Sequence, residues 1–306
     1  MNKRAILIAG PTASGKSSFA LQVARSVDGI IINADALQVY QNWRVLTARP
    51  SDAELRQAPH FLYGHIAKTT KYSVGQWLKD VAAVLEKTNR PAIIIGGTGL
   101  YFAALTNGLA EIPPIPDAVR RRGDLYRQSQ GVAWFCAQLK QHDPDTFAKL
   151  DQSNPARLQR AWEVLEATGK GLSHWHAHPA LPLVPLENAH AFVINWPVEA
   201  LNSRIDRRFD MMMQNGALKE CEAARMAGFE PDLPANRALG AREIIAALDG
   251  KITMQDAVIK AKIITHQFAK RQRTWFRSKM KNWQQIDMPM QESQGEILAR
   301  LAVEFR

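Results

Sequence analysis

The chain has 306 residues, 46% of them apolar, so it can bury a core large enough for one large domain or two smaller ones. No run approaches the roughly 20 apolar residues of a membrane-spanning helix, and the two cysteines, Cys136 and Cys221, are too far apart for a C-x-x-C motif. These features disfavour a membrane protein, a disulfide framework and a cysteine-rich zinc site, and they favour a soluble protein of the reducing cytoplasm.

Positive charge is concentrated in one segment. Lys and Arg outnumber Asp and Glu by 39 to 29, and between residues 257 and 286 there are basic residues but no acidic one. A concentrated basic patch favours a polyanionic partner, either a nucleic acid or an anionic membrane surface.

Three short Ile-rich runs, at 5–9, 29–33 and 92–95, predict strands that are buried on both faces. The first run is too short for the core of a signal peptide, so we interpret it as a strand. Helical patterns separate the runs, and a further strand is predicted at 191–196. This order favours an α/β fold with a parallel sheet, flanking helices and right-handed crossovers.

Two proline-rich stretches, at 111–116 and 179–185, interrupt this pattern. Only helical patterns lie between them, and the clearest helix is expected to begin after Asn154 as N-cap and to end at Gly169. We therefore predict a core in two parts, 1–112 and 186–306, the second with basic helices. An all-helical insertion domain, 113–185, separates them.

Residues 10–17 read GPTASGKS and match the phosphate-loop pattern G-x-x-x-x-G-K-[ST], between a predicted strand and a predicted helix. In such a loop, backbone N–H groups and the helix N-terminus surround the phosphates, the lysine adds a charge, and the last hydroxyl can ligate Mg²⁺. The sheet is therefore expected to be P-loop NTPase-like, with Mg²⁺ as cofactor on Ser17. The residues expected to bind a di- or triphosphate are Gly10, Pro11, Thr12, Ala13, Ser14, Gly15, Lys16 and Ser17.

The residues that follow the other strands narrow the chemistry. The third predicted strand runs into Gly96, Gly97 and Thr98, and not into the Asp that holds Mg²⁺ in nucleotide hydrolases of this fold, so an ATP-driven motor is disfavoured. Asp35 follows the second strand, where ligands bind in parallel sheets, and is a candidate general base. The simpler alternative is an Asp that caps its own turn.

Two chemistries stay open on these residues. In a small-molecule kinase, Asp35 would accept a hydroxyl proton while the terminal phosphoryl group of ATP is transferred. In a prenyl transfer, the diphosphate is the leaving group, the loop stabilises its charge, and Asp35 faces an amine.

Five further motifs, in order along the chain, resemble the tRNA dimethylallyltransferase (IPP transferase) family, and the resemblance spans about residues 5 to 280. They are D-A-L-Q-V-Y at 35–40, T-A-R-P at 47–50, G-G-T-G-L-Y at 96–101, N-P-A-R-L-Q-R-A-W-E through T-G at 154–169, and A-K-R-Q-R-T-W-F-R at 269–277. Ala36 departs from the family, which usually has Ser there, so any hydrogen bond of that Ser to RNA or to Asp35 is missing.

The resemblance implies the transfer of a dimethylallyl group from dimethylallyl diphosphate to the exocyclic amine of the adenosine immediately 3′ of the anticodon. The tRNAs would be those that read codons beginning with U, and diphosphate would be released. Asp35 would accept a proton from the amine, Thr98 would hydrogen-bond near the bridging oxygen or the incoming base, and Arg208 would add positive charge at the departing diphosphate. Without the resemblance, Arg208 is an ordinary solvated charge on a helix.

The resemblance also assigns RNA contacts, and it favours a monomer without an obligate protein partner. The insertion domain would clamp the anticodon stem-loop. In the basic segment, Trp275 and Phe276 alternate with bases, which suits RNA, although both aromatic residues also fit a core. The residues expected to contact tRNA are Asp35, Ala36, Leu37, Gln38, Thr98, Arg120, Ala156, Arg157, Leu158, Gln159, Arg160, Lys270, Arg271 and Arg273.

Other functions remain in competition. An isopentenyltransferase that acts on AMP would share the phosphate loop and Asp35 but would not need the insertion or the basic segment. A small-molecule kinase would need a lid over ATP, and no arginine-rich lid is visible. A non-catalytic RNA-binding module would not need a phosphate loop that faces a carboxylate.

Overall fold

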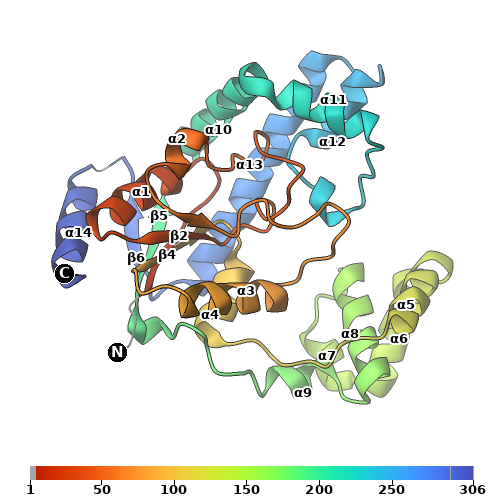
Figure 1. Cartoon of the computed structure of the whole chain (residues 1–306). Helices are drawn as coiled ribbons and strands as arrows, with labels where there is room; N and C mark the ends of the chain where they lie inside the picture. The colour runs from red at the N-terminus through yellow and green to blue at the C-terminus, as the bar shows by residue number, and fades with distance from the viewer. Residues whose placement is uncertain (1–4, 290, 306) are drawn as a thin grey trace. The chain divides into compact units, whose positions relative to one another are not determined.

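The computed structural model describes residues 5–289 and 291–305, which form two compact units (Figure 1). Unit 1 contains the described residues up to Thr106 and from Leu183 onward, and unit 2 is Asn107–Pro182. The predicted insertion, 113–185, starts and ends a few residues later than unit 2.

A six-stranded parallel sheet forms the centre of unit 1, in the spatial order β3-β2-β4-β1-β5-β6. The strands are β1 (Ala5–Ala9), β2 (Ile30–Asn33), β3 (His60–Phe61), β4 (Ala92–Gly96), β5 (Ala189–Asn195) and β6 (Gln284–Asp287). The predicted α/β class and parallel sheet are confirmed. The strands β3 and β6 were missed, because β3 has only two residues and β6 buries only Ile286.

Helices cover both faces of this sheet. Those of unit 1 are α1 (Lys16–Ser26), α2 (Asp52–Leu55), α3 (Val74–Glu86), α4 (Gly99–Asn107, which ends at the border with unit 2), α10 (Val198–Met212), α11 (Leu218–Met226), α12 (Ala241–Leu248), α13 (Met254–Lys279) and α14 (Gln291–Glu304). Short helical turns lie at Leu186–Asn188, Met213–Ala217 and Pro234–Asn236.

Alternating strand residues build two hydrophobic cores, because successive side chains point to opposite faces of a sheet. Leu7 and Ile94 pack on the side of α3, α4 and the end of α13. Ile8 and Ile95 pack on the side of α1 and α14 (Figure 1). Each fully buried aliphatic side chain contributes about 1.5–3 kcal/mol of transfer free energy. The sheet is thereby held rigidly between its helices.

A third core joins α10, α11, α12 and α13 through residues such as Phe209, Ile244 and Ala261. Thr253 is the N-cap of helix α13, and its hydroxyl accepts a hydrogen bond from the Asp256 N–H (3.0 Å). The helices α10 and α13 both supply side chains to the site described below.

Unit 2 is helical and has a core of its own around Phe135, Leu158 and Trp162. Its helices are α5 (Asp117–Ser129), α6 (Gly131–His142), α7 (Pro144–Lys149), α8 (Pro155–Thr168) and α9 (Leu172–His176). The predicted bounds of α8 are confirmed: Asn154 caps its first turn and Gly169, at φ 68°, ends it. Within the described residues, every helix is either too short or too polar to span a bilayer.

Candidate active site

The loop between β1 and α1 has left-handed backbone at Ala13 (φ 64°) and Gly15 (φ 86°). Glycine adopts this conformation freely, whereas it costs alanine about 1–2 kcal/mol. Left-handed residues within such a loop turn neighbouring N–H groups toward one side, and this makes a nest for an anion. The loop therefore has the shape that the phosphate motif predicts.

Three side chains from outside the loop bind its backbone. The hydrogen bonds are Thr12 N–H to Gln272 Oε1 (2.8 Å), Arg204 Nε–H to Ala13 O (2.9 Å) and Trp196 Nε1–H to Ser14 O (2.9 Å). The Arg204 guanidinium also lies over the Trp196 ring, 4.4 Å from its centroid. These contacts hold the loop in its strained conformation, because they fix the peptide groups on both sides of Ala13.

Two cationic side chains lie at this loop. Lys16 donates to Pro11 O (3.3 Å), and its pKa is lowered to about 8, mainly because burial removes water from its ammonium group. Arg208 donates from Nη2 to Thr12 Oγ1, and burial lowers its pKa to about 10. Both groups are charged at neutral pH and poorly hydrated, so an incoming anion gains more from them than from solvated cations.

Asp35 both caps its own turn and faces the end of β4. Its Oδ1 accepts the Leu37 N–H (2.9 Å), and its own N–H donates to Asn33 Oδ1 (2.9 Å). Its other oxygen, Oδ2, points toward β4, since a Cβ added at Gly97 would lie 3.4 Å from it. Oδ1 of Asp35 therefore caps the turn, as the simpler alternative predicts, and Oδ2 is the oxygen that can act as a general base.

Thr98 joins the loops that follow β2 and β4. Its Oγ1 accepts the Ala36 N–H (3.0 Å), and its own N–H donates to Ala34 O (3.2 Å). The hydroxyl proton can still be donated to a ligand, because only an acceptor position is used. Gly96 is required nearby, since a Cβ there would collide with the carbonyl group of Ala34.

Phosphate loop, carboxylate and apolar side chains meet in one cavity of unit 1. Thr12, Arg208 and Asp35 form its polar wall. The other lining residues are Leu37, Leu46, Thr47, Ile205, Phe209, Met212, Leu239, Thr265 and Phe268. The cavity thus has a polar end and an apolar end, as binding of a small apolar group attached to a diphosphate requires.

A larger cavity, of about 700 Å³, lies on the other side of the loop and is strongly basic. It is lined by Ala13, Ser14, Gly15, Lys16, Ser17, Ala48, Arg49, Glu54, Arg204, Arg207, Arg208, Asp210 and Met211. Arg208 lines both cavities, and so does the phosphate loop, with Thr12 in the first cavity and residues 13–17 in the second.

The oxygen donors for a metal ion are few. Ser17, the predicted Mg²⁺ ligand, is exposed in the basic cavity together with Glu54. Nowhere in residues 5–289 and 291–305 do three His, Cys, Asp or Glu side chains gather to hold a metal ion. This sparse set fits Mg²⁺, which commonly binds one or two protein oxygens and takes the rest from phosphates and water.

In unit 1, the residues expected to bind RNA differ in their exposure and in the hydrogen-bonding atoms that the protein leaves unused. The Gln38 amide donates to the carbonyls of Thr47 (2.7 Å) and Ala48 (3.1 Å), so its oxygen is the atom left for RNA. Ala36, Leu37 and Arg273 are half-buried, whereas Lys270 and Arg271 are exposed on α13. Phe276 belongs to the core, which is one of the two readings that the sequence left open for it.

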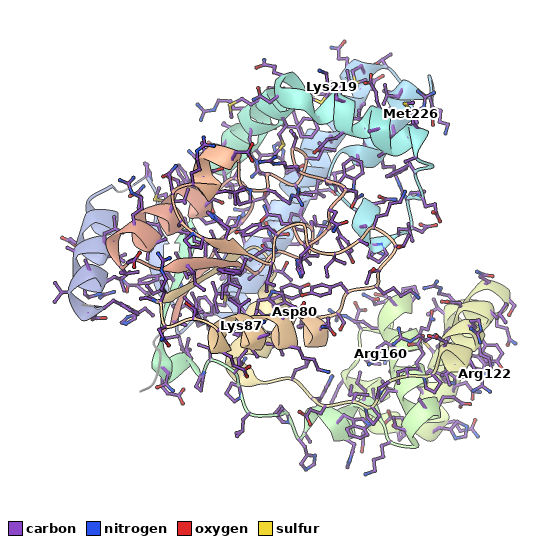
Figure 2. The ribbon with its side chains drawn as sticks, viewed as in Figure 1. Asp80, Lys87, Arg122, Arg160, Lys219 and Met226 are labelled. Atoms are coloured by element: carbon purple, nitrogen blue, oxygen red, sulfur yellow. The ribbon has the colours of Figure 1, made fainter. Side chains whose placement is uncertain are left out.

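In unit 2, α8 presents two kinds of predicted RNA-binding residue. Ala156 and Arg157 are exposed, whereas Arg160 (Figure 2) is half-buried. The pKa of Arg160 is lowered mainly by burial, and the positive charge of Arg120 lowers it further. Leu158 and Gln159 need a correction: Leu158 is fully buried in the unit 2 core, and Gln159 is buried with its amide bonded to Asp124 and Glu163 (both 2.9 Å). Their side chains cannot reach RNA without loss of this packing.

Sequence reasoning missed the residues that hold the phosphate loop: Gln272, Arg204 and Trp196. For Gln272 the sequence did contain a signal. Its long polar side chain stands in a row of helix residues that is otherwise small or apolar and is expected to be buried. That row is Ala257, Ala261, Thr265, Ala269, Gln272 and Phe276.

The lowered pKa of Lys16 predicts how anion binding depends on pH. Lys16 is charged below about pH 8 and neutral above it, so affinity for inorganic diphosphate should fall by up to about tenfold per pH unit above pH 8. Titration calorimetry of the wild type and of Lys16→Arg measures this, and the ratio of the two affinities cancels the titration of the ligand. The arginine variant stays charged, so a ratio that does not change between pH 7 and 9.5 would contradict the assignment.

Comparison with known proteins places the chain. A family model described as IPP transferase matches residues 38–279, and one described as isopentenyl transferase matches residues 3–65. A protein of Cereibacter sphaeroides named tRNA dimethylallyltransferase is 53% identical over 286 residues, which cover 94% of this chain and 90% of that protein.

Solved structures agree with this placement. The tRNA isopentenylpyrophosphate transferase of Bacillus halodurans has a TM-score of 0.69 and 28% identity, and the match covers 99% of this chain and 97% of that one. A eukaryotic dimethylallyltransferase described as acting on tRNA has a TM-score of 0.83 and 25% identity, over 98% of this chain and 77% of that one. The chain therefore belongs to the IPP transferase family.

Proposed function

We propose that the chain transfers a dimethylallyl group from dimethylallyl diphosphate to the exocyclic amine of the adenosine immediately 3′ of the anticodon, in tRNAs that read codons beginning with U, and releases diphosphate. One observation carries this proposal: Thr12 and Arg208 of the expected diphosphate site line one cavity together with the Asp35 carboxylate and several apolar side chains. The relatives named tRNA dimethylallyltransferase support the nature of the group and of the acceptor.

The geometry supports a displacement at the first carbon of the donor. The exocyclic nitrogen of adenine forms a bond to that carbon, and the carbon–oxygen bond to diphosphate breaks, so the electron pair goes to the diphosphate oxygen. Asp35 Oδ2 accepts a proton from the nitrogen, whose lone pair is otherwise delocalised into the purine ring. Alignment of the two reactants supplies a further large part of the rate.

Positive groups at the loop stabilise the charge that grows on the leaving diphosphate. Lys16, Arg208 and the backbone N–H groups of the nest are already in place, so little reorganisation is needed during the reaction. Thr98, which is held by Ala34 and Ala36, has a hydroxyl proton to donate near the bridging oxygen or the base. Bound Mg²⁺, held by Ser17 with Glu54 in reach of the same cavity, would add further charge neutralisation on the diphosphate.

We assign tRNA contacts to two exposed regions. One is formed by the basic side chains of Lys270 and Arg271 on α13, and the other is the start of α8, at Ala156 and Arg157. Bases in a single-stranded loop can be turned outward and read on their edges, while Lys and Arg bind the phosphates. Unit 2 would clamp the anticodon stem-loop, and we expect the enzyme to act as a monomer in the cytoplasm.

AMP is the main rival acceptor. The isopentenyl transferase model matches residues 3–65, which include the phosphate loop and Asp35, so the transfer chemistry alone does not select the acceptor. The IPP transferase match at 38–279 includes all of unit 2 and all of α13, and an enzyme for a free nucleotide needs neither.

An acceptor panel tests the proposal. The protein is incubated with Mg²⁺ and dimethylallyl diphosphate together with an anticodon stem-loop or AMP, or with ATP and a metabolite pool in place of the prenyl donor, and products are identified by mass. We expect a stem-loop heavier by one dimethylallyl group. Prenylated AMP with an unchanged stem-loop would instead establish the rival.

Asp35→Asn tests the base. The variant keeps the turn, because an amide oxygen can still accept the Leu37 N–H, but it cannot take a proton. Turnover in single-turnover kinetics should fall by about 10²–10⁴-fold, while affinity for inorganic diphosphate stays near that of the wild type. The matched control is Asp28→Asn, an exposed carboxylate paired with Arg90, and it should be fully active. Near-normal turnover of Asp35→Asn would remove Asp35 from this role.

Salt dependence tests the basic face of α13. For a stem-loop, each lost phosphate contact should reduce the steepness of log affinity against log salt by about 0.7–0.9. The double variant Lys270→Ala, Arg271→Ala is therefore expected to have a slope shallower by up to about 1.4–1.8. Lys87, which directly follows α3, and Lys219 on α11 (Figure 2) supply a control double variant with the same loss of charge. Equal slopes for the two double variants would contradict a specific role of α13.

A further inference from the structure

Gln272 is a buried polar residue whose whole amide is used at the site. Its side chain is only 5% exposed, in the stripe by which α13 packs onto the rest of unit 1. The oxygen accepts the Thr12 N–H (2.8 Å), and the nitrogen donates to Gly97 O (2.9 Å). One side chain thus joins the phosphate loop after β1 to the loop after β4.

The position of this amide relates two reacting groups to each other. Thr12 belongs to the diphosphate loop, and Gly97 precedes Thr98, which binds the Asp35 turn. A Cβ added at Gly97 would collide with the Gln272 nitrogen and would lie 3.4 Å from Asp35 Oδ2, so the amide and the carboxylate flank the same point. Gln272 therefore lies between the site of the leaving group and the base.

Few other side chains could do this at α13. The two partners need one donor and one acceptor at a fixed separation, which an amide supplies without a charge. An ionised Glu would offer only acceptors and would add a second negative charge beside Asp35. A hydrophobic residue would leave both Thr12 N–H and Gly97 O without these hydrogen bonds in a buried place, which destabilises the arrangement of the two loops.

We propose that Gln272 is a positioning residue that sets the separation between the diphosphate loop and the Asp35 carboxylate during prenyl transfer. This inference rests on the proposed function. Its physical basis is that an in-line displacement tolerates little error: a shift of about 1 Å between reacting groups can cost about a hundredfold in rate. Because the same helix turn presents Lys270 and Arg271 to solvent, the amide also ties the face assigned to RNA to the phosphate loop.

Gln272→Met in the full chain is the direct test, because methionine has nearly the same size and shape and makes neither bond. With the stem-loop as acceptor, kcat should fall by about tenfold to a hundredfold, while KM for dimethylallyl diphosphate changes by less than about threefold, since most of the nest remains. The matched control is Gln255→Met, an exposed glutamine in the first turn of the same helix, which should have wild-type kinetics.

Gln272→Glu gives a pH signature that a merely structural role would not produce. When protonated, the introduced carboxyl restores both bonds, because its O–H donates to Gly97 O and its carbonyl accepts the Thr12 N–H. Burial beside Asp35 raises its pKa above the usual range. The ratio of variant to wild-type kcat should therefore rise as pH is lowered.

The outcomes separate this inference from the proposed function. Absence of stem-loop prenylation by the wild type would remove the proposed function and, with it, the role of Gln272. Prenylation by the wild type together with an unchanged kcat per folded molecule in Gln272→Met would overturn the inference alone, even if the melting temperature falls. If Gln272→Met does not fold, the Gln272→Glu ratio decides, and a ratio independent of pH would contradict the positioning role.

Discussion

Parallel pairing of β4 with both β1 and β2 is the constraint on which the site depends. It places the three loops that follow these strands at one edge of the sheet: the phosphate loop, the Asp35 turn and the Gly97–Thr98 turn. Close approach at Gly96, where no side chain would fit against Ala34, brings the last two loops into direct hydrogen-bonding contact. The base and the diphosphate site are thus fixed by backbone pairing before any substrate binds.

Two kinds of side chain, cationic and apolar, surround that edge of the sheet. Cations partly removed from water, Lys16 and Arg208, surround the nest, and both have lowered pKa values because burial disfavours their charged forms. A diphosphate bound in this loop would supply these two cations with the favourable interactions that water no longer supplies. Under the proposed function, the apolar side chains beside Asp35 would face the other end of the donor, and specificity for a prenyl diphosphate is expected to come from the two ends together.

The sequence predicted those parts of the site that depend on neighbouring residues in the chain, and not those that depend on residues far apart in the chain. Residues 10–17 and Asp35 could be found because the motif is local and strand ends converge in every parallel sheet. The pattern of α13 could mark Gln272 as unusual, but the partners of Gln272, Trp196 and Arg204 could not be predicted, because each binds the loop from 180 or more residues away in the chain. Leu158 and Gln159 were assigned to RNA from a motif that spans consecutive residues, whereas a helix buries only those residues of such a run that lie on its packed face. Strands β3 and β6 have too few buried residues to leave a pattern.

A crystal structure of the chain with an anticodon stem-loop and an unreactive thio analogue of dimethylallyl diphosphate tests the central claim most directly. The account predicts the diphosphate of the analogue on residues 10–17. It also predicts the exocyclic nitrogen of the adenine next to the anticodon within about 2.6–3.2 Å of Asp35 Oδ2 and about 3–3.5 Å from the first carbon of the donor. An adenine whose amine points away from Asp35, or a diphosphate bound elsewhere than in that loop, would contradict it.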